Sequence, residues 1–354
     1  MDLSVIIPTH GRSAKAAACV QALTRQTLAS DRFEVILALD GVDPATVEAV
    51  TRVWDGPDDQ LVIDVAPHSG PSAVRNRAVA RARGRSLLFL NDDVVPSPTL
   101  AQVHADEQAE AFQRGRPAMI VGSAPWKRRQ PDTLFDRLLR ETSMVFFYDR
   151  MDGPASLGDP MRDWGFRHAW TLNLSVPTDL VRDAGGFTVF PQPFYGYEDV
   201  ELAFRLSEAS ATPVLYRPAA RVEHDHPMTL AQYLRREYTL GHEAITVARL
   251  RPRCARAVFG REVGAPEEIA YARLFVEREE RAVRQLHGSL LQASALPASA
   301  GDGLHGALLV RTLYEQHLPL KRWFWRRGLL DAAEGRALDC PAWADADHPH
   351  AAAA

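Results

Sequence analysis

Cysteine is scarce in this chain, which contains only Cys19, Cys254 and Cys340, and their spacings do not resemble a metal-binding motif. Three cysteines cannot all pair within one chain, so the sequence argues against a disulfide scaffold and favours a reducing compartment. Long apolar runs are also lacking, because none approaches the length of about 18 residues that a transmembrane helix needs. We therefore expect a cytoplasmic protein that is either soluble or attached peripherally at the inner face of the membrane.

A large excess of charge of one sign is lacking too, since the formal net charge is -4 and 46% of the residues are apolar. These values are ordinary for a globular protein and argue against a nucleic-acid partner held by a general attraction to phosphates. Lysine is rare beside arginine, so a local cluster of arginines carries little information. A G-x-x-x-x-G-K-[ST] segment is absent, which excludes a P-loop nucleotide site.

The first hundred residues alternate between β-branched runs and helical runs. Such alternation is typical of a parallel sheet covered by helices, whose ligands bind beyond the carboxyl ends of the strands. We expect strands at 3–7, 33–39, 61–65 and 86–90, and helices at 14–26, 44–54 and 71–82. Further helices are expected at 100–113 and 197–207 and further strands at 118–121, 171–176 and 214–216, with a long irregular stretch that ends near residue 167.

Beyond residue 227 the pattern is helical. We expect helices at 230–250, 267–291, 304–316 and 321–334, a linker at 293–303 and a disordered tail at 345–354. Because 354 residues exceed the usual size of a single core, one large α/β domain with an appended region is the natural division. The predicted domains are 1–227 for the α/β part and 228–344 for the helical C-terminal region.

Two adjacent acids, Asp92 and Asp93, follow directly after the buried-type strand at 86–90. Neighbouring carboxylates at a strand end are costly unless a positive group lies beside them. Mg²⁺ and Mn²⁺ take hard oxygen ligands from one or two carboxylates together with substrate phosphates. The pair therefore indicates a divalent cation that carries a diphosphate, and hence an enzyme that uses a nucleotide.

Five segments in a fixed order resemble the family 2 glycosyltransferases, and the match extends over about residues 3–226. The segments are Ser4-Val5-Ile6-Ile7-Pro8-Thr9, Leu39-Asp40-Gly41, Gly70-Pro71-Ser72-Ala73-Val74-Arg75-Asn76, Asn91-Asp92-Asp93, and Gly185-Gly186-Phe187 with Gly196-Tyr197-Glu198-Asp199-Val200-Glu201-Leu202. The resemblance implies the GT-A fold, a Rossmann-like α/β fold with a mixed sheet flanked by helices, followed here by the C-terminal helical region. It also divides the first domain into a nucleotide-binding half at 1–98 and an acceptor half at 99–227.

In that family the first two strand ends hold the nucleobase, so the resemblance implies contacts from the Thr9 backbone and the Asp40 carboxylate to a uracil or guanine edge. It also implies that Arg75 touches the base or a phosphate and that Asp92 lies near the ribose or a metal-bound water. Asp93 would be the direct metal ligand, at the end of a variant of the D-x-D motif. On the residues alone, Asp40 also fits a plain Asp-Gly turn, and Arg75 also fits a surface arginine.

The acids Glu198 and Asp199 resemble the family's E-D motif, in which the aspartate removes the proton from the attacking hydroxyl. The resemblance implies that Asp199 is the general base and that Glu198 binds acceptor hydroxyls or orients the site. The alternative is that both acids simply favour the N-terminus of a helix. His224 resembles the late histidine that completes the metal or diphosphate site in many relatives, with His226, on the same face of an extended chain, as the other candidate.

The C-terminal region leaves its partners open. Residues 232–236 match only part of the Q-x-x-R-W motif of processive sugar synthases, so we expect a non-processive enzyme. The segment 321–327 combines three aromatic and four basic residues, and it either contacts a membrane interface or packs as an amphipathic helix on the α/β domain. The helical region as a whole either covers the acceptor cleft, forms a homodimer or touches a membrane.

We therefore expect a metal-dependent, inverting glycosyltransferase of the hexosyl or N-acetylhexosaminyl type. Its donor would be a nucleoside diphosphate sugar such as a UDP-sugar, its cofactor Mn²⁺ or Mg²⁺, and its acceptor a hydroxyl of a glycan or lipid-linked molecule in polysaccharide or glycolipid biosynthesis. Two rivals stay open. One is a non-catalytic scaffold that binds sugar nucleotides, and the other is a sugar-1-phosphate nucleotidyltransferase, for which the segment Pro8-Thr9-His10-Gly11-Arg12 is too short and too poor in glycine.

Overall fold

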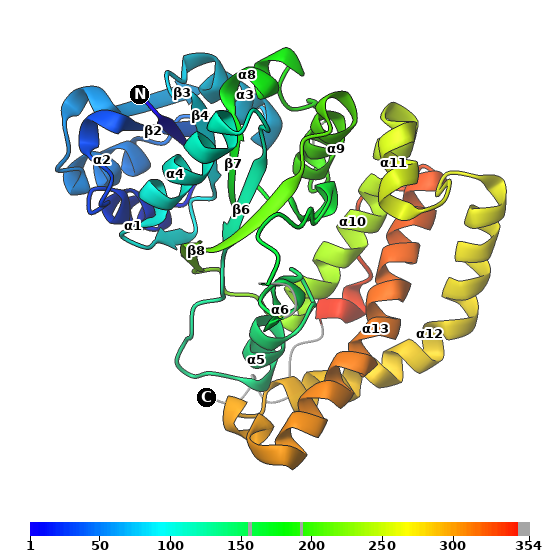
Figure 1. The fold of residues 1–354 in the computed structure, drawn as a ribbon. Helices are drawn as coiled ribbons and strands as arrows, with labels where there is room; N and C mark the ends of the chain where they lie inside the picture. Colours follow the sequence, from blue (N-terminus) through cyan, green and yellow to red (C-terminus); the bar gives the residue numbers. More distant parts are fainter. Residues whose placement is uncertain (155–157, 192–193, 346–354) are drawn as a thin grey trace. The chain divides into compact units, whose positions relative to one another are not determined.

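The computed structural model describes residues 1–154, 158–191 and 194–345. The chain forms two compact units (Figure 1), of which the first contains residues 1–127 and 148–226, and the second contains residues 128–147 and the described residues from 227 onward. The predicted domain bounds of 1–227 and 228–344 stay a prediction. Of the predicted disordered tail at 345–354, only Asp345 is among the described residues, as the last residue of a 3₁₀ turn.

The first unit is built on an eight-stranded mixed sheet with the order β3-β2-β1-β4-β7-β6-β8-β5. Strands β1 to β4 run parallel, β7 is antiparallel to β4 and β6, β8 is parallel to β6, and β5 is antiparallel to β8. All residues of β2 and β4 are buried, as expected of strands covered on both faces. The strands are β1 (Leu3–Thr9), β2 (Phe33–Asp40), β3 (Leu61–Ala66), β4 (Ser86–Leu90), β5 (Val94–Pro96), β6 (Met119–Ser123), β7 (Asn173–Pro177) and β8 (Val214–His224).

Helices flank this sheet, as Figure 1 shows, and the predicted α/β class with a mixed sheet is confirmed. Proline in the first turn helps to start α2 and α3, because its fixed φ suits that position. The side chain of Asp43 also caps α2 by accepting a hydrogen bond from Thr46 N. The helices are α1 (Ser13–Leu23), α2 (Pro44–Val53), α3 (Pro71–Arg81), α4 (Leu100–Gln113), α6 (Tyr148–Met151), α8 (Thr178–Asp183) and α9 (Glu198–Ser210).

Strand pairing brings distant segments of the chain to one edge of the sheet. The carboxyl ends of β1 to β4 share an edge because these strands run parallel. Leu90, the last residue of β4, lies opposite Asn173, the first residue of β7. Val94 in β5 lies opposite His224, the last residue of β8. The edge expected to bind ligands therefore also receives the start of β7 and the end of β8.

The second unit is helical, and its helix α13 packs against α10 and α12. The segment 321–327 lies in α13, where Trp323 and Phe324 are buried and contact the ring of Trp343. Trp323 also donates its indole hydrogen to the backbone oxygen of Val276 in α12, at 3.0 Å. These two aromatic side chains therefore pack inside the helical unit. Its helices are α5 (Leu134–Glu141), α10 (Leu230–Leu250), α11 (Pro252–Phe259), α12 (Pro266–Ser294) and α13 (Gly303–Ala333).

Within the described ranges, no helix combines the length and the apolar character needed to cross a bilayer. Several predicted elements are confirmed with their bounds, namely the strand at 86–90 and the helices at 100–113 and 230–250.

Four sequence expectations about the elements are wrong. The helices expected at 304–316 and 321–334 are one helix, α13, which continues through Pro319. The stretch expected to be irregular contains α5 and α6, and the expected linker at 293–303 begins with the end of α12 and includes a 3₁₀ turn at Ala298–Gly301. The strand expected at 214–216 continues to His224 because β8 pairs first with β6 and then with β5. These partners are far away along the chain, so the local sequence does not reveal them.

Candidate functional site

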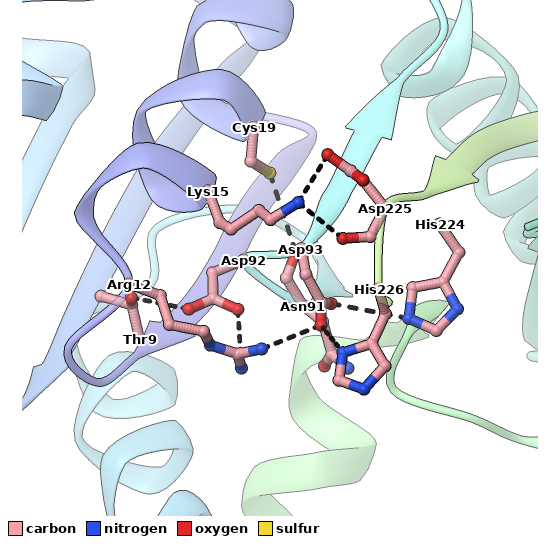
Figure 2. A network of polar contacts seen from close by, with 10 residues as sticks. All are labelled: Thr9, Arg12, Lys15, Cys19, Asn91, Asp92, Asp93, His224, Asp225 and His226. Atoms are coloured by element: carbon pink, nitrogen blue, oxygen red, sulfur yellow. Dashed lines mark hydrogen bonds and ion pairs between the residues drawn. The ribbon is translucent and has the colours of Figure 1, made fainter. Parts of the chain in front are cut away.

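The two acids after β4 are buried and share one positive partner. Asp92 is 0% exposed and Asp93 is 5% exposed. Figure 2 shows the guanidinium of Arg12 between them, 2.8 Å from Asp92 Oδ1 and 2.9 Å from Asp93 Oδ2. Thr9 Oγ1 donates a further hydrogen bond to Asp92 Oδ2 at 2.7 Å. An arginine from the turn between β1 and α1 thus supplies positive charge that neighbouring carboxylates require.

The two carboxyl groups differ in their affinity for protons. Burial raises the pKa of Asp92 to about 6, against the opposing charge of Arg12. Burial also acts on Asp93, but the hydrogen bond from His226 and the charges of His224 and Arg12 outweigh it and lower its pKa to about 2. Because burial lowers the pKa of His224 to about 4, that ring is neutral at pH 7 and its charge does not contribute there. A carboxylate beside a neutral imidazole is the protonation pattern that metal ligands require.

Asp93 lies beside two histidines at the end of β8. One ligand atom from each of Asp93, His224 and His226 lies within 4.8 Å of the other two. Asp93 Oδ1 is buried and accepts no hydrogen bond from the described residues, although His224 Nε2 lies 3.8 Å away. The ring of Trp126 packs on this group, with its centroid 4.4 Å from that of His224. Two imidazoles and a carboxylate are a donor set that fits a divalent transition-metal ion.

Lysine joins arginine on the β1 side of the same group. Lys15 Nζ lies 2.6 Å from Asp225 Oδ2 and donates to the backbone oxygen of Asp225 at 2.8 Å. The backbone N–H of Asp225 in turn donates to the backbone oxygen of Asp93 at 2.8 Å. The start of α1 therefore brings two cations, Arg12 and Lys15, to the acid–histidine cluster. Such cations are suited to the oxygens of a diphosphate.

Asp40 ends β2 and organises the loop that leads into α3. Its carboxylate accepts hydrogen bonds from Ser69 N at 2.6 Å and from Gly70 N at 3.1 Å. His68 Nδ1 lies 3.0 Å from Asp40 Oδ2. The residue after Asp40, Gly41, has a φ of 116°, which glycine tolerates and other residues rarely adopt. Asp40 is thus a turn residue that also fixes the loop before α3.

Arg75 pairs with the first acid of α9 and does not lie on the surface. Its side chain is buried, and Arg75 Nη1 lies 3.3 Å from Glu198 Oε1. Its guanidinium also lies over the ring of Phe187, 5.5 Å from the centroid. The alternative of a surface arginine is therefore wrong. Arg75 links the helix after the Asp40 loop to the acids at the start of α9.

Asp199 lies in the first turn of α9, beside Glu198. Its carboxylate accepts a hydrogen bond from Val200 N at 2.8 Å and a longer one from Thr171 N at 3.4 Å. Burial, and after it the negative charge of Glu198, raise the pKa of Asp199 to about 6, against the charge of Arg75. A carboxylate with a pKa near neutrality is a suitable general base.

Two polar clamps hold the loop before α9. Asn76 Nδ2 donates to the oxygen of Phe187 at 2.9 Å, and Phe187 N donates to Asn76 Oδ1 at 2.7 Å. Arg205 donates to the oxygen of Gly186 at 2.6 Å while its guanidinium pairs with Glu201 at 2.8 Å. The Gly-Gly-Phe segment therefore positions α9 against α3 through its backbone.

The sheet register places Asp199 and the acid–histidine cluster on one edge. The amide that faces Asp199 belongs to Thr171, two residues before Asn173. Asn173 lies opposite Leu90, and Asp93 follows Leu90 by three residues. Residues more than a hundred positions apart are therefore brought to the same end of the sheet.

The structure sorts the predicted site residues into groups. One set of residues meets at the end of β4, and a second set meets at the start of α9. Asp40 belongs to neither set and is bonded to the loop before α3. The first set is Thr9, Asp92, Asp93 and His224, and the second is Arg75, Glu198 and Asp199. Sequence reasoning missed Arg12, Lys15 and Trp126. The need of two adjacent acids for a cation was the one signal that pointed to Arg12.

Comparison with known proteins identifies a family for the first part of the chain. Residues 4–169 match the sequence model of the family described as glycosyl transferase family 2. This chain carries a glycosyl transferase family 2 domain. The domain contains the ends of β1, β2 and β4 and the acid pair, whereas the acids of α9 and the histidines of β8 follow the matched residues.

Proteins with sequences similar to this chain include validoxylamine A glucosyltransferase from Streptomyces hygroscopicus subsp. jinggangensis. It is 27% identical over 257 residues, which cover 64% of this chain and 56% of the relative. Poly(ribitol-phosphate) beta-glucosyltransferase from Bacillus spizizenii is 28% identical over 150 residues, which cover 41% of this chain and 24% of the relative. The chain spans about half the length of the first of these relatives.

A solved structure shares the fold of this chain. It is the mannosyltransferase PcManGT from Pyrobaculum calidifontis in complex with GDP-Man and Mn²⁺, with a TM-score of 0.52 and 16% sequence identity. The similarity covers 94% of this chain and 86% of that one. At this identity the likeness concerns the fold, and the expected GT-A fold is confirmed.

Proposed function

We propose that the protein is an inverting glycosyltransferase that moves a sugar from a nucleoside diphosphate donor to a hydroxyl acceptor. The observation that carries this proposal is the shared sheet edge, which holds both the acid–histidine group around Asp93, suited to a cation, and the half-buried Asp199, whose pKa is raised. Single displacement at a sugar carbon needs both features. The leaving diphosphate needs positive charge, and the attacking hydroxyl needs a base.

Asp93, His224 and His226 would hold a divalent cation, because one ligand atom of each lies within 4.8 Å of the others and Asp93 Oδ1 is a buried acceptor. When bound, such an ion supplies positive charge that stabilises the departing diphosphate. In this proposal both His224 and His226 serve as ligands, because both lie in the same group as Asp93. Of the two expected ions we propose Mn²⁺, because Mg²⁺ prefers oxygen ligands alone and this group contains two imidazoles.

Three segments of the chain would bind the donor. The Thr9 backbone and the Asp40 carboxylate would contact the nucleobase, since a carboxylate retains lone pairs beyond those that Ser69 and Gly70 occupy. Asp92 would lie near the ribose, where its raised pKa allows it to donate a hydrogen bond below pH 6. Arg12 would bind the diphosphate, because its guanidinium already lies against the acids that hold the cation.

Asp199 would accept the proton of the attacking hydroxyl, so that the acceptor oxygen gains the sugar and the Asp199 carboxyl gains the proton. Glu198 would assist in two ways. Its charge raises the proton affinity of Asp199, and its side chain is placed by Arg75 at 3.3 Å. We accordingly extend the role of Arg75 from a nucleotide contact to the positioning of the acid pair.

The donor sugar is a hexosyl or N-acetylhexosaminyl group in this proposal. Two relatives are named glucosyltransferases, and the solved structure of similar fold is a mannosyltransferase with GDP-Man. The acceptor would be a hydroxyl of a glycan or of a lipid-linked molecule in polysaccharide or glycolipid assembly.

The test measures nucleotide release from a panel of UDP-, GDP- and dTDP-sugars with Mn²⁺ and a panel of hydroxyl acceptors. Removing a general base costs roughly a hundredfold to ten-thousandfold in rate, so the rate of nucleotide release by Asp199→Asn should be lower by that factor. Glu208→Gln is the matched control, because Glu208 is an exposed acid on the same helix. Thermal unfolding with each sugar nucleotide gives a second readout, since a ligand that binds the native state raises the melting temperature.

Two outcomes would reject the proposal. If Asp199→Asn turned over as fast as the unchanged protein, the base assignment would fail. Donor binding without turnover across the whole acceptor panel would favour a scaffold that binds sugar nucleotides.

A further inference from the structure

A second group of metal-ligating side chains lies apart from the Asp93 cluster, at the ends of β1, β2 and β3. It consists of His10, Asp40 and His68, and one ligand atom of each lies within 4.8 Å of the other two. The three strands are neighbours and run parallel, so their carboxyl ends bring the three residues together. The two imidazole rings lie 4.9 Å apart.

His10 has the arrangement of a histidine prepared for a metal. Its Nδ1 lies 2.5 Å from the backbone oxygen of Asp40, which is an acceptor only, so Nδ1 carries the proton. The lone pair of the neutral ring is then on Nε2. A hydrogen bond from the second ring nitrogen to a backbone carbonyl is the usual way in which proteins fix the tautomer of a metal-bound histidine.

Asp40 is fixed in a similar way. Two backbone N–H groups, from Ser69 and Gly70, donate to its carboxylate at 2.6 and 3.1 Å. Outer hydrogen bonds of this kind orient a ligating carboxylate. Its Oδ2 already contacts His68 Nδ1 at 3.0 Å.

The ligand atoms of His10, Asp40 and His68 would bind a small cation after a modest shortening of the distances between them. Ligands held at about 2 Å by a tetrahedral ion lie roughly 3.4 Å apart. At present the three ligand atoms lie up to 4.8 Å apart. Asp40 is buried, but both histidines are exposed, so their side chains can move closer to Asp40 without a shift of the core.

We infer that His10, Asp40 and His68 form a second divalent-metal site, selective for ions that favour imidazole ligands, such as Zn²⁺ and Co²⁺. Two imidazoles and one carboxylate are a donor set of that type, whereas Mg²⁺ prefers oxygen ligands alone. The site does not depend on the proposed transfer reaction. One consequence rests on that proposal: because Asp40 would recognise the nucleobase, an ion bound here would compete with the nucleotide.

The experiment titrates Co²⁺ into the full chain and follows its visible absorption, with Zn²⁺ calorimetry as the second measurement. The protein should bind one more equivalent than either His10→Ala or His68→Ala. His305→Ala is the matched control, since this exposed histidine lies in the helical unit, and it should retain the full number. A double variant, His224→Ala with His226→Ala, should lose the other equivalent and keep this one.

An equal number of equivalents and equal affinities in the unchanged protein, His10→Ala and His68→Ala would overturn the site. Circular dichroism and the melting temperature check that each variant is folded, which is expected because both side chains are exposed. The two assignments can also fail separately. If His68→Ala lost the Zn²⁺ equivalent but nucleotide did not displace Zn²⁺ from the unchanged protein, the metal site would be supported and the nucleobase role of Asp40 would be contradicted.

Discussion

Arg12 lies 2.9 Å from Asp93, the acid beside His224 and His226, and its guanidinium also lies 2.8 Å from Asp92. The guanidinium therefore neutralises the same carboxylates that a divalent cation would use. A bound cation and Arg12 would compete for Asp93, whereas a diphosphate on the cation would offer Arg12 a new acceptor. In the proposed mechanism the arginine would thus link metal binding to donor binding.

Replacing Arg12 with alanine should tighten Mn²⁺ binding in the absence of nucleotide. Because 45% of the Arg12 side chain is exposed, the competing ion pairs are worth at most about 1 kcal/mol, so the metal Kd should fall by up to roughly fivefold. Donor affinity should weaken in the same variant. Isothermal titration measures both quantities, with Arg32→Ala, which removes an exposed pair with Asp2, as the control. Weaker Mn²⁺ binding by Arg12→Ala would contradict the competition.

The transfer rate should fall as the pH falls through about 6, because Asp199 has a pKa raised to about 6 and only its deprotonated form accepts a proton. The slope on the acid side should be tenfold per pH unit. Asp92 titrates in the same range, but a bound cation stabilises its charged form and moves its pKa downward. We therefore expect the acid limb to persist at saturating Mn²⁺ and to vanish in Asp199→Asn. A flat profile between pH 5 and pH 7 would contradict this role.

Much of the first unit follows from local sequence. The strand at 86–90 is a buried apolar run that ends in two acids, and its bounds were predicted correctly. The helix at 100–113 was predictable for the same reason, since its pattern is local. The chain order of strands and helices then indicates which strand ends share an edge.

The partners of the acids were less predictable, because they depend on long-range pairing. His224 meets Asp93 only because Val94 lies opposite His224, and nothing in the local pattern after residue 216 reveals that register. Arg12 belongs to a turn whose side-chain direction the sequence does not specify. The two helices predicted at 304–316 and 321–334 lie on either side of Pro319. A proline inside a helix usually breaks it, yet α13 continues through this residue.

His104 should make stability depend on pH. It is buried between Asn173 Oδ1 and Ser175 Oγ, at 2.9 Å from each, and burial lowers its pKa to about 4. An unfolded histidine titrates near 6.5, so the unfolded state binds the extra proton first. The neutral His104 ring therefore costs no stability above a pH of about 6.5, and the free energy of unfolding decreases as the pH falls from there toward 4.

Urea unfolding at a series of pH values between 7.5 and 5 checks this expectation. Each unit of pKa difference corresponds to about 1.4 kcal/mol. The slope of the free energy of unfolding against pH reports how many protons the chain takes up on unfolding, and His104→Gln should lower that number by about one. The same variant should also lower the free energy of unfolding at pH 7. His305→Gln, at an exposed histidine, should leave the dependence unchanged. A slope that His104→Gln does not alter would show that this ring is not the titrating group.

Gly186→Ala should destabilise the protein more than Gly185→Ala. Both glycines have positive φ, 75° and 77°, and an alanine costs about 1 kcal/mol in that region. A Cβ at Gly186 would also lie 2.4 Å from Asn76 Oδ1, whereas a Cβ at Gly185 would meet nothing within 4 Å. The overlap would displace the acceptor of the Phe187 N–H, so Gly186→Ala should cost roughly 2 kcal/mol more.

The difference between the two glycine variants isolates the contact with Asn76, because their backbone strain is nearly equal. Urea unfolding at pH 7 gives both free energies. In the background of Asn76→Ala the hydrogen bond is already lost and the space is open, so Gly186→Ala should then cost no more than Gly185→Ala does. Equal costs of the two alanines in the unchanged protein would mean that the loop before α9 can shift away from α3, and that the clamp does not fix the position of Asp199.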